Sequence, residues 1–159
     1  MQMINLTDKG EKISTSTIEA FEKKIGKKFP VEFKEFLIKN NGGYPDKILF
    51  TPKFIEINPV KHEKISQGTD IEQFLPLDDI SVEYQDILDE NYIPSEYVPF
   101  ARSSFANLIL MYLTPTEKYG EIYFANHDLY DVKNNRFTIS KITDSFSKLI
   151  NSLYVPDLD

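Results

Sequence analysis

The sequence of 159 residues contains no cysteine and no tryptophan. The absence of cysteine excludes disulfide frameworks, thiolate zinc sites, iron–sulfur ligation and cysteine nucleophiles. Long apolar runs are missing too, because the longest one, residues 108–113, is far shorter than the roughly 20 residues that cross a bilayer. The amino terminus shows no basic stretch followed by an apolar segment, as a secretory signal would. These absences predict a cytoplasmic protein without a membrane span.

Several enzyme motifs are also lacking. The six glycines stand at positions 10, 26, 42, 43, 68 and 120, and none opens a helix with nucleotide-binding spacing. Neither the G-x-S-x-G nor the H-E-x-x-H pattern occurs, which excludes those signatures of hydrolases and zinc proteases. We therefore expect no nucleotide site and no catalytic site of these types, and we predict that the chain holds no cofactor and no metal.

Apolar and aromatic residues are plentiful by comparison. They make up 41% and 13% of the chain, with 12 phenylalanines and nine tyrosines. This is too much apolar material for a disordered chain, and the length suits one hydrophobic core. The composition predicts a single domain over residues 1–159.

The net charge of −7 is unevenly distributed along the chain. Residues 1–64 carry 12 basic and nine acidic side chains, and residues 100–159 carry six and seven. Residues 65–99, here called the acidic segment, contain nine carboxylates and neither lysine nor arginine. Such a segment is either a solvated face or a docking surface that attracts a basic partner. Its field repels phosphates, which argues against nucleic-acid and membrane binding.

Helical spacing predicts a hairpin of two helices near the amino terminus. Ser16 and Glu19 have the form of a capping box for the first helix, which ends at Gly26. The second helix begins after Pro30 and stops at Asn41. The side chains expected to face inward are Phe21, Ile25, Phe29, Phe33 and Phe36.

Two further helices are predicted, one in the acidic segment and one near the carboxyl end. Asp79 is the expected cap of the middle helix, and Thr143 or Asp144 that of the last helix. The predicted buried stripe of the middle helix consists of Ile80, Tyr84, Ile87 and Leu88. That of the last helix consists of Phe146, Leu149, Ile150 and Leu153.

Short β-prone stretches separate the helices. They comprise residues 48–57, 71–77, 98–101, 108–113, 122–124 and 137–139. The polar residues 58–69 are expected to form a mobile loop. The order predicts an α+β fold: an N-terminal helical hairpin, a mainly antiparallel sheet, one middle helix and a C-terminal helix packed on the sheet.

The two histidines are the remaining candidates for chemistry. His127 follows a predicted strand and precedes Asp128, which places an acid beside a possible base or metal ligand. Asn126, His127 and Asp128 are equally ordinary turn formers, and His62 lies in a charged loop. Aromatic side chains around the same predicted hairpin are either core residues or interface anchors: Tyr112, Tyr119, Tyr123, Phe124 and Tyr130.

Four stretches in order resemble the SUKH superfamily, which includes the Smi/Knr-type fungal cell-wall-assembly regulators and many small bacterial proteins. They are IEAFEKKIGKKFPVEFKEFL at 18–37 with NNGGYP at 40–45, FLPL at 74–77, GEIYFANHD at 120–128 and TDSF at 143–146. One stretch departs from the family pattern. Where members often carry a Gly-rich segment with a Gly-Asn pair, residues 101–106 contain no glycine, and only Asn107 matches.

The resemblance implies an α+β domain with a non-catalytic role, because bacterial members are mostly immunity proteins that bind and neutralise a cognate toxin. Those toxins are often nucleases, which are basic around their sites, so the acidic segment is a suitable complement. The expected partner is a cognate protein toxin, and the chain is expected to be a monomer or weak homodimer. A general interaction scaffold of the Smi/Knr type is the alternative. The predicted partner-binding residues are Asp78, Asp79, Glu83, Asp86, Asp89 and Glu90, with Tyr84 or Tyr92 as aromatic anchors.

Overall fold

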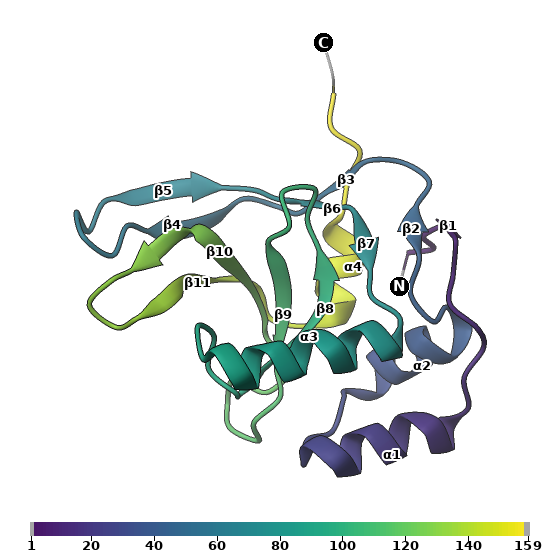
Figure 1. Cartoon of the computed structure of the whole chain (residues 1–159). Coiled ribbons are helices and arrows are strands. Elements are labelled where there is room, and N and C mark those ends of the chain that lie inside the picture. Colours follow the sequence, from purple (N-terminus) through teal and green to yellow (C-terminus); the bar gives the residue numbers. More distant parts are fainter. Residues whose placement is uncertain (1, 158–159) are drawn as a thin grey trace.

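The computed structural model describes residues 2–157 (Figure 1). The helices are α1 (Thr15–Ile25), α2 (Val31–Lys39), α3 (Leu77–Glu90) and α4 (Phe146–Ser152). The strands are β1 (Leu6–Thr7), β2 (Tyr44–Pro45), β3 (Leu49–Phe50), β4 (Phe54–Ile57), β5 (Lys64–Gln67), β6 (Asp70–Ile71), β7 (Gln73–Phe74), β8 (Tyr97–Arg102), β9 (Leu108–Tyr112), β10 (Ile122–Asp131) and β11 (Arg136–Thr143). Helices and antiparallel strands are segregated along the chain, which confirms the predicted α+β class.

The centre of the fold is a five-stranded antiparallel sheet with the order β11-β10-β9-β8-β7. Three further strand pairs, β1 with β2, β3 with β6 and β4 with β5, surround it. The predicted strands at 98–101, 108–113, 122–124 and 137–139 all lie in the central sheet. Successive side chains of each strand point to opposite faces of the sheet, and helices cover both faces.

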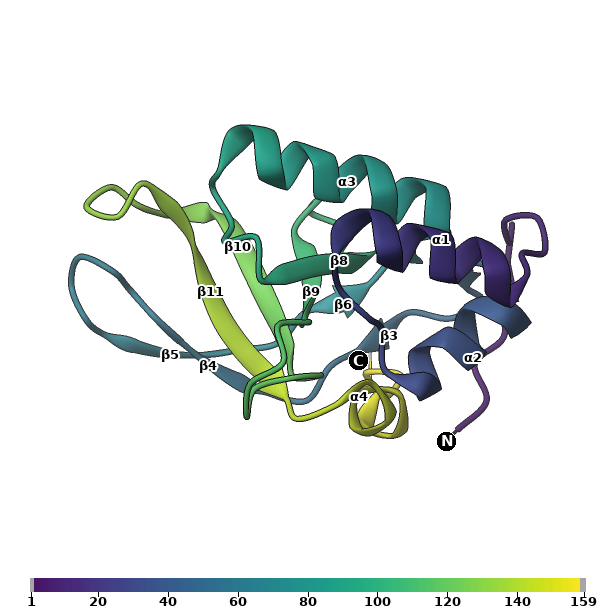
Figure 2. The ribbon, with the colours of Figure 1, turned by 90° about the horizontal axis from the view of Figure 1, so that it is seen from below.

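The helices pack on opposite sides of this sheet, with α3 on one side and α4 on the other (Figure 2). Under the carboxyl-terminal half of α3, Ile87 packs with Leu110 and Tyr123. On the α4 side, Phe33 of α2 makes edge-to-face contacts with Phe100 and Phe146, at ring-centroid distances of 5.6 and 5.0 Å. The buried aromatic cluster explains why the phenylalanine-rich hairpin docks there.

The hairpin of α1 and α2 has the predicted inward face. Phe21, Phe29 and Phe33 are buried, and Ile25 and Phe36 are half-buried against the core. In α3 the prediction was wrong for Leu88, which is 45% exposed. It lies beside the stripe of buried residues at spacing 77, 80, 84 and 87, and this stripe alone faces the sheet.

All three predicted helix caps were wrong. The first helix is capped by Ser14, whose hydroxyl accepts from the Thr17 amide, instead of by Ser16. The last is capped by Ser145, not by Thr143 or Asp144. The middle helix begins at Leu77, before Asp79, because Oδ1 of the distant Asn41 accepts the Leu77 amide at 2.8 Å. A side chain from another element thus supplies the cap that local sequence was expected to supply.

Two strand predictions also need correction. Residues 58–69 do not form one loop, because β5 lies within them and pairs with β4 in a hairpin. Residues 71–77 do not form one strand, since β6 ends at Ile71, β7 ends at Phe74 and α3 starts at Leu77. Each short piece pairs with a different strand, β6 with β3 and β7 with β8, so tertiary pairing divides the segment.

Candidate functional site

Six carboxylates of α3 form what we call the acidic α3 surface: Asp78, Asp79, Glu83, Asp86, Asp89 and Glu90. Five of them are exposed, and Glu83 is half-buried. Asp79, Glu83, Asp86 and Glu90 recur at helical spacing along one flank of α3, beside the buried stripe. The helix therefore gathers most of the charge of the acidic segment on one surface.

This flank borders a small hollow between α3 and the sheet, with a volume of about 220 Å³. Glu83, Asp86 and Glu90 line it, together with the ring of Tyr92. Tyr92 stacks on Phe137 at a centroid distance of 5.2 Å. The structure thus brings three predicted carboxylates next to one predicted aromatic anchor, a combination suited to a basic side chain from a partner.

Tyr84 does not belong to this surface, which corrects one predicted site residue. Its side chain is 4% exposed, and its hydroxyl donates to the Ser95 carbonyl at 2.7 Å. Burial, and then the charge of Glu96, raise the pKa of Tyr84 above its usual value. The position belongs to the stripe that docks α3 on the sheet, so Tyr84 supports the surface from beneath.

One cation contacts the acidic α3 surface. The guanidinium of Arg102, in β8, donates to Oε1 of Glu83 at 2.6 Å. Both side chains are partly exposed, so the pair contributes little to stability. It neutralises one carboxylate of the six.

His127 and Asp128 lie in β10, at a register shift between Asn126 and Tyr130. His127 Nε2 is 3.3 Å from Asp128 Oδ1, and both side chains are solvent-exposed. The His127 amide donates to Asn107 Oδ1, and the Asp128 amide to Asn126 Oδ1. Across residues 2–157, no three acidic or histidine side chains converge as metal ligands. The motif therefore lies inside β10 at an irregularity of the pairing, and the prediction of a turn after a strand was wrong. His62 lies between β4 and β5 with a φ of 59°.

Asn126 and Asp128 border a groove of about 540 Å³, here called the Phe105 groove. This groove was not predicted from the sequence. Its apolar lining comes from Ile48, Phe50, Phe105 and Phe124. The only available signal was the departure of residues 101–106 from the family's glycine pattern. In the structure Ala106 adopts a φ of 62°, a left-handed conformation that glycine adopts without cost.

A buried carboxylate lies close to this groove. Glu56, in β4, is 2% exposed. Its oxygens accept from Nδ2 of Asn126 at 3.1 and 3.2 Å and from Nε2 of Gln67 at 3.4 Å. Both amide residues line the Phe105 groove. The hydrogen-bond donors to this carboxyl group are the side-chain amides of two neutral residues.

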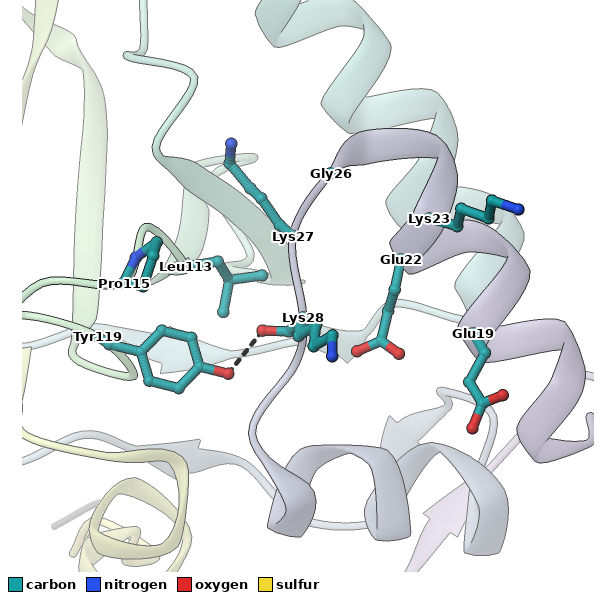
Figure 3. Close-up of a pocket in the computed structure, with 9 residues that line it drawn as sticks. All are labelled: Glu19, Glu22, Lys23, Gly26, Lys27, Lys28, Leu113, Pro115 and Tyr119. Carbon is teal, nitrogen blue, oxygen red and sulfur yellow. Dashed lines mark hydrogen bonds between the residues drawn. The ribbon is translucent and has the colours of Figure 1, made fainter.

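A larger groove of about 650 Å³ lies between the α1–α2 turn and the loop that follows β9 (Figure 3). Leu113 and Pro115 supply apolar lining, and Lys27 and Lys28 come from the turn. The hydroxyl of Tyr119 donates to the Lys28 carbonyl at 2.6 Å. Burial, with the charges of Glu22 and Glu32, raises the pKa of Tyr119 above its usual value. Glu19 and Glu22 also line this groove, so its charge is mixed, in contrast to the acidic α3 surface.

The remaining predicted aromatics divide between the core and the surface. Phe124 and Tyr123 are buried, whereas Tyr112 and Tyr130 are half-buried and Tyr119 is 38% exposed. Tyr123 and Phe124 are neighbours in β10, so they enter the two opposite faces of the sheet. These five aromatic residues therefore do not form one surface, as the alternation of side chains along a strand predicts.

Comparison with protein families identifies one match. The family described as SMI1 / KNR4 family (SUKH-1) matches residues 12–152. The matched span includes all four stretches on which the resemblance was based, and confirms it. No curated protein matches the chain. Within the described residues, no helix is long and apolar enough to cross a membrane.

Proposed function

This chain belongs to the SMI1/KNR4 family (SUKH-1), and from that premise we propose that it is an immunity protein. It binds a cognate toxin, a nuclease, and neutralises it by covering its basic surface with the acidic α3 surface. The role requires binding without catalysis, and it places the protein in the cytoplasm, where such a toxin acts. Asp78, Asp79, Glu83, Asp86, Asp89, Glu90 and Tyr92 carry the contact.

The observation that carries the proposal is that the carboxylates at the carboxyl end of α3 do not serve the helix that bears them, whereas Asp78 and Asp79 in its first turn suit the helix dipole. Asp89 and Glu90 stand in the last turn of α3, which contains no basic residue, although the helix dipole favours cations there. Asp86 and Glu90 are also like charges four residues apart, which disfavours the helix. Folding stability alone does not account for this arrangement, whereas recognition of a basic partner does.

The geometry suits the surface of a nuclease. Enzymes that handle phosphates present lysine and arginine around their sites, and a concentrated negative field accelerates encounter with such a surface. Once docked, a basic side chain of the toxin enters the hollow beside Tyr92, between Glu83 and Glu90. This contact would keep nucleic acid from the toxin's site.

The test combines charge reversal with growth rescue. The partner is the carboxy-terminal domain of a large secreted protein encoded beside this gene, co-expressed and co-purified with the chain. We expect Asp86→Lys with Glu90→Lys to abolish rescue and to flatten the salt dependence of binding. The matched control is Glu35→Lys with Glu63→Lys, the same change in charge at two exposed residues that lie in α2 and in the β4–β5 hairpin. Equal affinities for both double variants would show that α3 is not the interface.

A protein-interaction scaffold of the Smi/Knr type is the second candidate, and the family name supports it directly. A scaffold would bind several host proteins and protect against no toxin. Growth rescue distinguishes the two functions, because only the immunity protein restores growth of cells that express the neighbouring toxin domain.

A further inference from the structure

Phe105 is the most exposed aromatic side chain among residues 2–157, with 79% of its surface accessible. It lies in the loop between β8 and β9, where it borders the Phe105 groove with Phe50 and Phe124. An exposed aromatic ring costs solvation free energy that burial would recover. Exposed rings beside a groove are typical of protein–protein contact sites.

The loop that carries Phe105 is held at both ends. The Ser104 amide donates to Oδ1 of Asp70 at 3.1 Å, and the Ser104 hydroxyl donates to the same carboxylate. On the other side of Phe105, Oδ1 of Asn107 accepts the His127 amide at 3.0 Å. The loop is thereby bonded to β6 and to β10. The backbone that carries the ring is held in place, so binding of a partner requires little further ordering of this loop.

The electrostatics of the groove are one-sided. Asp70 and Asp128 line it, and among the described residues that line it there is no lysine or arginine. The nearest cation is Lys53, whose ammonium lies beside Gly68 at the edge of the groove. Gln67 and Asn126, which line the groove, donate to the buried carboxyl group of Glu56, so a third acidic residue lies directly behind the lining. Asp128 itself is 75% exposed and available to a ligand. A cation with an apolar or planar body complements this combination.

We propose that the Phe105 groove binds an arginine side chain presented by a protein partner. The guanidinium stacks on the ring of Phe105 and donates to Asp128, while the aliphatic stem lies along Phe124. Arginine fits better than lysine because its planar, weakly hydrated head both stacks on aromatic rings and bonds carboxylates in a bidentate manner. The groove gives Asp128 a recognition role in place of a catalytic one.

This site goes beyond the proposed function because it is separate from the acidic α3 surface. Phe124 of the groove and Tyr123 beneath α3 are adjacent in β10 and therefore face opposite sides of the sheet. The two surfaces can be tested independently. A small arginine probe needs no toxin, so failure of this proposal and failure of the immunity proposal give different results.

The experiment is an NMR titration of the whole chain with Nα-acetyl-arginine amide. Backbone amides of Gly68, Thr69, Asn107 and Asn126 should shift with a saturable dependence on probe concentration. Nα-acetyl-lysine amide should bind more weakly, and the uncharged Nα-acetyl-norleucine amide should not saturate. Equal affinities for arginine and lysine, or shifts confined to α3, would overturn the proposal.

Two pairs of variants provide the controls. Phe105→Ala should weaken arginine binding about two- to fivefold, the effect expected for an exposed cation–π contact. Val132→Ala should leave it unchanged, although Val132 is exposed to a similar degree, 75% against 79%. Asp128→Asn should weaken it as well, whereas Asp78→Asn, at another exposed carboxylate, should not. If both members of either pair behave alike, the groove is not the arginine site.

Discussion

The acidic α3 surface and the Phe105 groove offer two different contributions to a protein interface, namely charge and an exposed aromatic side chain. The first has six carboxylates, three of which line a hollow of about 220 Å³. The second has an exposed phenylalanine over a groove of about 540 Å³ with two carboxylates in its lining. Charge acts at a distance of about one Debye length and raises the rate of encounter. A rigid aromatic ring acts only in contact and slows dissociation. The comparison teaches that the two surfaces should differ in their sensitivity to salt and to truncation.

The two surfaces are also held in place by different interactions. Helix α3 docks through the buried side chains of Ile80, Tyr84 and Ile87. The loop that carries Phe105 is held by two hydrogen bonds: the Ser104 amide donates to Asp70, and Asn107 Oδ1 accepts the His127 amide. Apolar burial contributes more free energy per residue than one hydrogen bond. Substitutions beneath α3 are therefore expected to cost more than those beneath the loop.

The largest effect is expected from Ile80→Ala, which removes a fully buried contact between α3 and the sheet. We expect the free energy of unfolding to fall by about 2–5 kcal/mol, the usual range for this truncation in a core. Urea denaturation followed by circular dichroism measures it. Val82→Ala in the same helix, at a residue 60% exposed, should change stability by no more than about 0.5 kcal/mol. Similar values for both would mean that α3 is not docked through this stripe.

A smaller effect is expected on the side of the groove. Asn107→Ala removes the acceptor of the His127 amide from a residue that is 6% exposed. The loss should be about 1–3 kcal/mol, the cost of leaving a partly buried donor unsatisfied. The control is Asn151→Ala in α4, which is exposed. A change of stability no larger than that of the control would show that the loop is held in another way.

Ala106→Gly should sharpen the comparison by stabilising the loop without new contacts. Ala106 has a φ of 62°, and a left-handed conformation costs a residue with a Cβ about 1–2 kcal/mol. After the greater flexibility of glycine in the unfolded chain is subtracted, the expected gain is about 0.5–1 kcal/mol. The same substitution at Ala20, exposed in α1, should instead destabilise by about 1 kcal/mol. Calorimetric melting of both variants tests the opposite signs.

The smallest effect is expected for the ion pair between Glu83 and Arg102, beneath the acidic surface. A double-mutant cycle with Glu83→Gln and Arg102→Gln should give a coupling of no more than about 1 kcal/mol, because both side chains are partly solvated. The coupling should shrink as salt is added. A coupling well above this value would mean that charge pairing, and not apolar burial, holds α3 on the sheet.

Much of the architecture followed from local patterns. The spacing of Phe21, Phe29 and Phe33 predicted the inward face of the helical hairpin, and the uninterrupted apolar run at residues 108–113 predicted a strand. These predictions succeeded because helical and strand periodicities are properties of neighbouring residues. The acidic segment was equally evident, since charge is counted without knowing the fold.

Contacts between distant residues accounted for the errors. Asn41 caps α3 from another part of the chain, so the local candidate Asp79 was wrong. Tyrosine has an apolar ring and a polar hydroxyl, so Tyr84 could lie either on the surface or in the core. It is buried because the Ser95 carbonyl, which follows α3, accepts its hydroxyl. Residues 58–69 are polar in composition, yet β5 pairs with β4.

The sequence by itself determined the order of helices and strands, the family and the charge of the middle segment, because each depends on composition or short-range periodicity. The tertiary structure alone decided which flank of α3 borders a hollow, and that Phe105 lies over a groove beside Asp70 and Asp128. Residues 70, 105 and 128 line one groove because β9 pairs with β10 and because Ser104, in the loop before β9, is bonded to Asp70 of β6. Such long-range pairing depends on the free energy of the whole fold, which no local pattern contains.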